Sequence, residues 1–213
     1  MNESQKTNEL QQIGKQLMNL ELAWGTAGNI SSRNDENSFY ITKSGTKLGE
    51  LGDNDFVLVP NEMDNKKPSK EYNMHKAIYD NRSEMNAVIH CAPFYSTLIS
   101  CSSLELTNNT FVEAMYYLEK VVNIPYKHPG SLELAKEVEK KVTEANVFIL
   151  ENHGILVCDV NMKEALMSVE TLEFAAKMLI TAKNSNIEMD YLTDDVVRDF
   201  LNNAGYKSRR EWY

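Results

Sequence analysis

The sequence has few cysteines, no long apolar run and no excess of basic residues, and each of these absences excludes a class of protein. Its three cysteines, Cys91, Cys101 and Cys158, are an odd number without C-x-x-C spacing, which argues against both a disulfide framework and a thiolate zinc site. No apolar run approaches the length that spans a bilayer, and the polar start MNESQKTNELQQ lacks the apolar core of a signal peptide. We therefore expect a soluble, cytoplasmic protein with no membrane partner.

The charge balance excludes a further class of partner. A net charge of −9 over 213 residues argues against nucleic acid, because phosphate contacts along a nucleic acid require a basic face. A small anionic ligand is compatible with this charge, since backbone amides and single cations bind phosphate locally. With 42% apolar residues and no repeat or long linker, the chain can build one full core. We expect a single α/β domain over residues 1–213, with helices over a mixed sheet.

Apolar residues recur at spacings that predict alternating helices and strands. We expect strands at residues 38–42, 56–59, 87–90, 147–150 and 155–158. We expect helices over residues 5–20, from about residue 94, over 131–145, through 165–179, and from a Thr193 cap onward. Ser69 is expected to cap a further helix with Glu71 in its first turn, where the helix dipole favours an anion.

Three stretches follow no clear period. Residues 24–31 mix glycines with small polar side chains and are expected to form a loop. Residues 102–124 give no readable pattern. The tail at residues 207–213 combines cations with two aromatic side chains, and it either frays or docks on the body or on a neighbouring subunit.

Polar side chains gather at the ends of several predicted elements. Two groups supply hydroxyls, an amide, glycine N–H groups and a lysine, which together can hold a phosphate without a basic protein. These groups are Thr26, Ala27, Gly28, Asn29 and Ser31, and then Ser44, Gly45, Ser69 and Lys70. Taken singly, each group has the composition of an ordinary turn. The two groups form a binding site only if the fold brings them together.

A third group, Glu71, His90 and His153, comes from three separate elements. Two imidazoles and a carboxylate can form a metal site with open positions that polarises a carbonyl oxygen. The alternative is a pair of structural histidines and a glutamate that complements a helix dipole. His75, one helical turn after Glu71, is interpreted as a packing group or a support for a ligand, because the H-E-x-x-H pattern is absent.

Six segments stand in a recognisable order along residues 9–180. They are G-T-A-G-N-I-S-S-R (25–33), I-T-K-S-G (41–45), P-S-K-E (68–71), A-V-I-H (87–90), I-P-Y-K-H-P-G-S-L-E-L-A (124–135) and N-H-G-I-L-V (152–157). In this order they resemble the class II aldolase/adducin family. The resemblance implies a three-layer α/β/α sandwich with a central, largely antiparallel mixed sheet. It also implies a homotetramer with active sites between subunits, a divalent metal, usually zinc, and a sugar phosphate as substrate.

The resemblance also implies roles for individual residues. Glu71 falls on the catalytic acid/base, and His90 and His153 fall on two of the family's three zinc-binding histidines. The positions that would hold the substrate phosphate are Thr26, Gly28, Asn29, Ser44, Gly45, Ser69 and Lys70, the last standing where the family usually has serine. Glutamate at position 71, where the family's epimerases carry aspartate, favours carbon–carbon bond cleavage over epimerisation.

The family's H-x-H pattern is incomplete in this chain, because His90-Cys91-Ala92 has alanine at the third position. Adjacent strand residues face opposite sides, so Cys91 cannot simply replace the missing ligand. We expect a weakened divalent metal site that is either completed by Glu71 or empty. The expected function is a metal-dependent aldolase that cleaves a ketose 1-phosphate to dihydroxyacetone phosphate and an aldehyde. The alternatives are a catalytically silent, adducin-like binding or assembly protein, and a sugar-phosphate dehydratase or epimerase.

Overall fold

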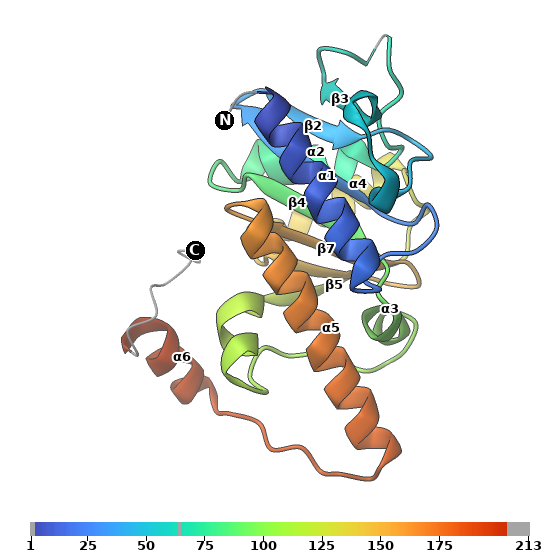
Figure 1. Ribbon diagram of the computed structural model, residues 1–213. Helices are drawn as coiled ribbons and strands as arrows, with labels where there is room; N and C mark the ends of the chain where they lie inside the picture. The colour runs from blue at the N-terminus through green and yellow to red at the C-terminus, as the bar shows by residue number, and fades with distance from the viewer. Residues whose placement is uncertain (1–2, 64, 204–213) are drawn as a thin grey trace.

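The computed structural model describes residues 3–63 and 65–203, and a seven-stranded sheet forms the centre of this part of the molecule (Figure 1). The strand order is β3-β2-β1-β4-β7-β6-β5, in which only β5 and β6 pair in parallel. This confirms the expected mixed, largely antiparallel sheet. The strands are β1 Asn29–Asp35, β2 Ser38–Thr42, β3 Phe56–Val59, β4 Ala87–Cys91, β5 Val121–Ile124, β6 Val147–Leu150 and β7 Gly154–Asp159.

Helices cover both faces of the sheet, as expected for a three-layer sandwich (Figure 1). One face carries α1, α3 and α5, whose apolar side chains form one core cluster with the sheet. The other face carries α2 and α4, which contact each other and share a second cluster. The helices are α1 Glu3–Asn19, α2 Tyr72–Asn81, α3 Phe94–Ser100, α4 Leu132–Lys141, α5 Met162–Asn184 and α6 Asp194–Asn203, with short turns η1 Leu48–Glu50, η2 Asp53–Asp55 and η3 Ala114–Leu118.

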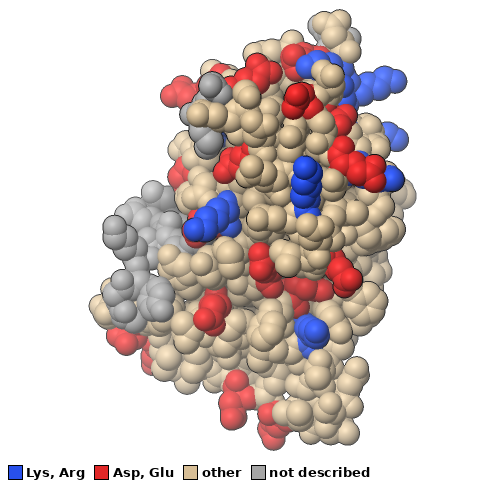
Figure 2. Space-filling view, viewed as in Figure 1, with Lys and Arg blue, Asp and Glu red and all other residues tan. Residues whose placement is uncertain are grey.

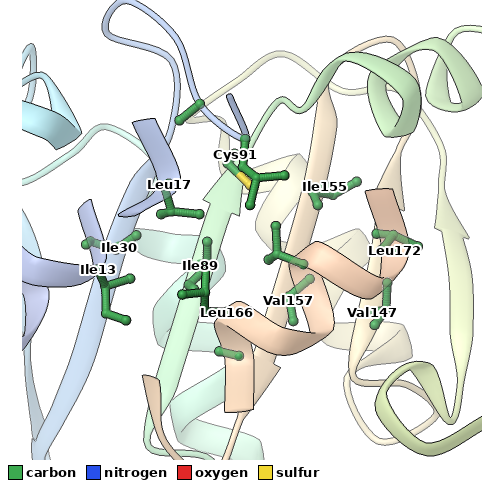
Figure 3. Close-up of a cluster of buried hydrophobic side chains, with 14 of the residues drawn as sticks. Ile13, Leu17, Ile30, Ile89, Cys91, Val147, Ile155, Val157, Leu166 and Leu172 are labelled. Carbon is green, nitrogen blue, oxygen red and sulfur yellow. The ribbon is translucent and has the colours of Figure 1, made fainter. Parts of the chain in front are cut away.

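The central strands send alternate side chains to the two clusters. Ile89 and Cys91 of β4 join the cluster under α1 and α5, together with Ile155 of β7 (Figure 3). Val88 of β4 joins the cluster under α2 and α4. Burial of each large aliphatic side chain stabilises the fold by about 1.5–3 kcal/mol. By the same alternation, His90 faces the α2 side at the end of its strand.

The expected start of the helix is wrong by two residues, since its N-cap is Glu71 and not Ser69. Helix α2 begins at Tyr72, and Glu71 occupies its N-cap position without a side-chain cap bond. The backbone of Ser69 instead donates from its N–H to the carbonyl oxygen of Thr42, the last residue of β2, at 2.9 Å. The Ser69 hydroxyl accepts from the Glu71 N–H at 3.3 Å. Pairing with the sheet therefore delays the helix and leaves the Glu71 side chain outside its first turn.

Two strands were not expected from the sequence. Strand β1 includes Asn29, Ile30 and Ser31, which the sequence placed in a loop. Its sequence N-I-S-S-R-N-D is mostly polar, yet its first four residues are buried. Strand β5 lies in the stretch that gave no pattern, and its first two residues are half-buried and its third is exposed. Neither strand has the apolar alternation that identifies a strand in an isolated sequence.

The remaining elements agree with the sequence to within a few residues. Strands β2 and β3 have the expected bounds, and α1 coincides closely with the helix expected over residues 5–20. The Thr193 hydroxyl accepts from the Val196 N–H at 3.4 Å, which confirms the expected cap of α6. Of the helices described, none has both the length and the apolarity to cross a bilayer. On the face drawn in Figure 2, Lys and Arg side chains stand among Asp and Glu and form no continuous basic surface.

Candidate metal centre and anion pocket

Glu71, His90 and His153 meet at one end of the sheet. Glu71 precedes α2, His90 lies near the end of β4, and His153 lies in the turn between β6 and β7. Glu71 Oε2 is 3.2 Å from His90 Nε2, and Glu71 Oε1 is 3.2 Å from His153 Nε2. One ligand atom from each residue lies within 4.8 Å of the other two. The residues that the sequence grouped as a possible metal site are therefore within coordinating reach of a common point.

Strand pairing brings these side chains together. In the antiparallel pairing of β1 with β4, Asn29 lies opposite His90, and on the other side His90 lies opposite Leu156 of β7. The turn that carries His153 leads directly into β7 at Gly154. Since β4 lies between β1 and β7, its end adjoins both Asn29 and the turn that carries His153, and the Asn29 side chain in turn donates a hydrogen bond to Glu71.

Two glycines allow the chain to pass close to the end of β4. Gly28 has φ +100°, and a Cβ at this position would lie 2.7 Å from the His90 carbonyl oxygen. Gly154 has φ +147°, and its Cβ would lie 2.6 Å from the Cys91 carbonyl oxygen. Real Cβ atoms do not approach backbone oxygens so closely, and L side chains rarely adopt these φ values. Glycine at both positions is thus a geometric requirement of the site.

The hydrogen bonding of His90 fixes which nitrogen faces the site. Its Nδ1 lies 2.8 Å from the Ile155 carbonyl oxygen, which can only accept, so Nδ1 carries a proton. In a neutral imidazole, Nε2 then presents a lone pair toward the Glu71 carboxylate. Two lone pairs at 3.2 Å repel each other unless a proton or a cation lies between them. A backbone bond to the opposite ring nitrogen is the usual way in which a metal-binding histidine is oriented.

The electrostatics of the site favour charge on both partners. Burial alone would raise the pKa of Glu71, but His90 and His153 beside it hold that pKa well below its usual range. Burial alone would lower the pKa of His90, but the Glu71 carboxylate and the Ile155 carbonyl raise it above its ordinary value. The carboxylate is therefore ionised, and a positive charge next to it is stabilised, whether that charge is a proton or a metal ion.

Two buried polar atoms at this point lack a hydrogen bond. Glu71 Oε1 has none apart from the close approach of His153 Nε2, and His153 Nδ1 has no partner in the described part of the chain. Buried polar atoms are normally paired, so such atoms call for a further partner. A carboxylate oxygen and two imidazole nitrogens are a donor set that divalent transition metals accept, with positions left open. These residues fit a divalent ion.

Ala92 occupies the place from which a third ligand could reach the site. It lines the same cavity as His90 and His153, two residues after His90. The Cys91 side chain is buried on the opposite face of the sheet, where the apolar surroundings raise the pKa of its thiol (Figure 3). Cys91 therefore does not replace the absent histidine.

A cavity of about 280 Å³ joins the histidine and glutamate cluster to the two polar turns. It brings together the predicted phosphate-binding positions and adds two polar residues, Lys43 and Thr46, that the sequence did not single out. The sequence could have indicated Lys43 and Thr46 only because they flank Ser44 and Gly45. The lining residues are Thr26, Ala27, Gly28, Asn29, Lys43, Ser44, Gly45, Thr46, Ser69, Lys70, Glu71, His90, Ala92, Pro129 and His153.

The side chains of Asn29 and Ser31 both contact His75, but only Asn29 also lines the cavity. The Asn29 side chain donates from Nδ2 to Glu71 Oε2 at 2.9 Å, and its Oδ1 lies 2.6 Å from His75 Nε2. Ser31 is absent from the cavity wall, and its hydroxyl contacts His75 Nδ1 at 2.6 Å. His75 is fully buried, and burial together with nearby His90 lowers its pKa to about 3, so it is a neutral supporting group.

Known proteins with similar sequences include sugar-phosphate aldolases and decarboxylases. Residues 8–180 match the model of the Class II Aldolase and Adducin N-terminal domain. The 3-oxo-tetronate 4-phosphate decarboxylase of Haemophilus influenzae is 33% identical over 199 residues, covering 90% of this chain and 93% of the relative. An L-fuculose phosphate aldolase of Methanococcus maripaludis is 36% identical over 156 residues, covering 72% of this chain and 84% of the relative.

Solved structures share the fold over nearly the whole chain. YgbL of Klebsiella pneumoniae, whose description leaves open aldolase, epimerase and decarboxylase activity, superposes with a TM-score of 0.85 at 31% identity, covering 94% of this chain and 100% of that one. An L-fuculose 1-phosphate aldolase superposes with a TM-score of 0.85 at 29% identity, covering 94% and 96%. The sequence resemblance is thereby confirmed, and this chain belongs to the class II aldolase/adducin family.

Proposed function

We propose that this chain is a metal-dependent lyase that cleaves a carbon–carbon bond of a sugar phosphate. One observation carries the proposal: Glu71, His90 and His153 offer three donor atoms within 4.8 Å of one another, in the wall of a cavity that also has hydroxyl and glycine-rich turns. Class II aldolases depend on a divalent metal. When bound to these three residues, such an ion would polarise a substrate carbonyl oxygen and stabilise the negative charge that develops on it. Zinc is the ion we expect first, because it accepts imidazole and carboxylate ligands in this number.

The polar turns that line the same cavity are proposed to bind the substrate phosphate. Hydroxyl groups and glycine N–H groups hold a phosphate by hydrogen bonds, and one lysine adds a positive charge. Asn29 already donates one N–H to Glu71, which leaves the second N–H of its amide for a ligand. The proposed phosphate-binding residues are Thr26, Gly28, Asn29, Ser44, Gly45, Ser69 and Lys70.

The first candidate reaction is the cleavage of a ketose 1-phosphate by a retro-aldol step. A base takes the proton of the hydroxyl group on the carbon β to the ketone, and the bond between the α and β carbons breaks. The aldehyde leaves, and the electron pair passes to the ketone oxygen until a proton returns to the α carbon, which gives dihydroxyacetone phosphate. Glu71 is the proposed proton carrier, because Oε1 is the carboxylate oxygen left without a hydrogen bond.

A second candidate, decarboxylation, is favoured by the relative from Haemophilus influenzae, which matches 90% of this chain and is named for a decarboxylase activity. A 3-oxo acid loses carbon dioxide when the bond to its carboxylate breaks and the electron pair passes to the ketone oxygen. Like the retro-aldol step, this cleavage requires stabilisation of the negative charge on the ketone oxygen and a proton for the α carbon. Unlike the retro-aldol step, it requires no base to remove a hydroxyl proton. One site can therefore support either reaction, and the substrate decides between them.

Metal content and product analysis together test the proposal. The purified protein is analysed for bound metal and then incubated with L-fuculose 1-phosphate or 3-oxo-tetronate 4-phosphate, with Zn²⁺, Mn²⁺ or Co²⁺ added. Aldehyde release identifies the aldolase and carbon dioxide release identifies the decarboxylase. His90→Ala should abolish metal uptake, and His128→Ala, which changes an exposed histidine, should not. Less than about a tenth of an equivalent of metal, with no rescue by added ions, would favour a silent, adducin-like binding protein.

We also propose that residues 1–213 form one domain and that four copies associate in the cytoplasm. Two large apolar side chains are exposed close to the cavity, Trp24 at 65% and Phe94 at 69%. The Trp24 indole N–H donates to the carbonyl oxygen of Ala92 at 3.2 Å, so this surface adjoins the proposed metal site. Large apolar side chains exposed beside a cavity are suited to a contact between subunits. A mass four times that of the chain in light scattering would support the tetramer.

A further inference from the structure

We propose that His75 is a positioning residue, which fixes the Glu71 carboxylate through the side-chain amide of Asn29. The catalytic consequence of this arrangement rests on the proposed function, but the arrangement itself does not. Four contacts connect the buried hydroxyl of Tyr79 to the carboxylate in the cavity. They are Tyr79 Oη to Ser31 Oγ at 2.8 Å, Ser31 Oγ to His75 Nδ1 at 2.6 Å, His75 Nε2 to Asn29 Oδ1 at 2.6 Å, and Asn29 Nδ2 to Glu71 Oε2 at 2.9 Å.

The secondary structure explains how one imidazole makes both bonds. Asn29 and Ser31 are two residues apart in β1, so their side chains point to the same face of the sheet. Helix α2 lies over that face, and His75 projects from it between the two. Each ring nitrogen therefore reaches a different residue of the same strand. The side chains of Asn29, Ser31 and His75 are all buried, so water does not compete for these bonds.

The charge of Glu71 determines the direction of the contacts next to it. An ionised carboxylate can only accept, so the Asn29 amide must present Nδ2 to Glu71 and Oδ1 to His75. An amide oxygen can also only accept, so the proton of His75 lies on Nε2. Burial lowers the pKa of His75 to about 3, so the ring is neutral and its Nδ1 accepts. The hydroxyl of Ser31 is then the donor to Nδ1.

The far end of the network is also satisfied. The hydroxyl of Tyr79 lies 3.0 Å from the carbonyl oxygen of Ser31 as well as close to its Oγ, so its proton has an acceptor in either direction. Every polar atom from Tyr79 to Glu71 along this path thus has a hydrogen-bond partner that matches it. Fully satisfied buried networks are rigid, because any member that turns leaves another without a partner.

The network leaves the two oxygens of Glu71 with different roles. Oε2 is held by the Asn29 amide and lies beside His90, whereas Oε1 faces His153 with no hydrogen bond. If His75 did not hold Oδ1 of Asn29, the amide could rotate by half a turn and present its oxygen to the carboxylate, which repels it. His75 therefore determines which carboxylate oxygen is free to take a metal ion or a proton.

Cobalt binding tests the role of His75 with a matched set of variants. His75→Leu removes both ring nitrogens, His75→Gln retains an amide N–H that can reach Asn29, and Ile78→Val trims a buried side chain of the same helix away from the network. We expect His75→Leu to weaken Co²⁺ binding by about 10-fold or more, since groups that orient a ligand have effects of that size. His75→Gln and Ile78→Val should stay within about threefold of the original protein. Equal affinity in a folded His75→Leu protein, or an equal loss in all three variants, would overturn the proposal.

A measurement on the unaltered protein needs neither metal nor turnover. In ¹⁵N spectra of histidine-labelled protein at pH 6 to 8, His75, assigned by its loss in His75→Gln, should show a neutral ring with the proton on Nε2. A proton on Nδ1 would overturn the proposal, because the Asn29 amide would then lack its donor. Failure of the unaltered protein to bind Co²⁺ would count against the proposed function instead, and this spectrum would still decide the role of His75.

Discussion

The Nε2 atom of His90 lies 3.2 Å from Oε2 of Glu71, while the other nitrogen of the same ring is bound to the carbonyl oxygen of Ile155 at 2.8 Å. The ring therefore cannot turn without losing a buried hydrogen bond. Glu71 is equally restrained, because Asn29 donates to the same carboxylate oxygen. The imidazole and the carboxylate each present an electron pair to the other, so a proton or a metal ion between them is stabilised. Of the two groups, Glu71 carries the negative charge, and replacing it by glutamine removes that charge.

Replacing Glu71 by glutamine should separate its two possible roles. Glu71→Gln removes the negative charge and the proton-accepting oxygen, and we expect kcat/KM to fall by about 10²–10⁴-fold. Co²⁺ affinity measured on the same protein distinguishes the causes: a parallel loss of affinity identifies Glu71 as a ligand, and unchanged affinity identifies it as a proton carrier alone. Glu50→Gln, which changes a largely exposed carboxylate, is the control and should alter neither quantity. Full activity in Glu71→Gln would contradict both roles.

Introducing histidine at position 92 should strengthen metal binding. Ala92 lines the cavity with His90 and His153, and two residues after His90 is the same side of the extended chain. We expect Ala92→His to raise Zn²⁺ affinity by about 10-fold or more, because a third imidazole would complete the ligand set. Competition with a chromogenic chelator measures the affinity. Lys47→His adds an imidazole at an exposed position outside the residues that line the cavity, and a similar gain in that control would show that a simple excess of histidine is responsible.

Much of the fold could be predicted from the sequence because its strands are apolar where they are buried on both faces. The run Val147–Leu150 is an example, since all four side chains are buried. Strand β1 was missed for the opposite reason. Its buried Asn29 and Ser31 are polar, and they are satisfied by His75, which is more than 40 residues away in the sequence. No local pattern reveals a partner at that separation, so a buried polar strand is indistinguishable from a loop until the fold is known.

The candidate site was predicted unevenly for a related reason. The residue types and their order indicated Glu71, His90 and His153. The pairing of β4 with β1 and β7 places His90 beside Asn29 and the turn that carries His153, and the Asn29 amide holds Glu71 next to them. The expected cap at Ser69 is wrong, because a serine three residues before a helix looks like a cap even when its backbone pairs with a strand. The bond from Asn29 to Glu71 had no signal in the sequence, since it depends on which way a side-chain amide points.

The buried His75 should make the protein less stable in acid. Its pKa is about 3 in the folded protein, whereas a histidine in an unfolded chain has a pKa near 6.5. Between these values the unfolded chain binds a proton that the folded protein cannot, so the free energy of unfolding falls as the pH is lowered from about 6.5 toward about 3. One such group contributes a slope of up to ~1.4 kcal/mol per pH unit. Above about pH 6.5 it contributes no slope, because the side chain is neutral in both states.

His75→Gln removes this titration. The free energy of unfolding of the variant should therefore depend less steeply on pH, by up to ~1.4 kcal/mol per pH unit below about pH 6.5. Urea unfolding of both proteins between pH 4 and 7, in the presence of a chelator so that metal binding does not contribute, measures the difference. We expect the two curves of stability against pH to converge toward low pH. Parallel curves would mean that His75 takes up its proton in the folded protein, contrary to its burial between Asn29 and Ser31.

Alanine at two glycines should separate backbone strain from steric contact at the end of β4. Gly28 and Gly45 have similar positive φ angles, +100° and +83°, but only Gly28 would bring a Cβ against another atom, 2.7 Å from the His90 carbonyl oxygen. Gly45→Ala should therefore cost about 1–3 kcal/mol from strain alone. Gly28→Ala should cost about 1–3 kcal/mol more, because the backbone of His90 must move. It should also weaken Co²⁺ binding, whereas Gly45→Ala should not, since the displaced residue is a proposed ligand. Denaturant unfolding and metal titration of the two variants make the comparison, and equal losses of stability would show that the contact with His90 has no energetic weight.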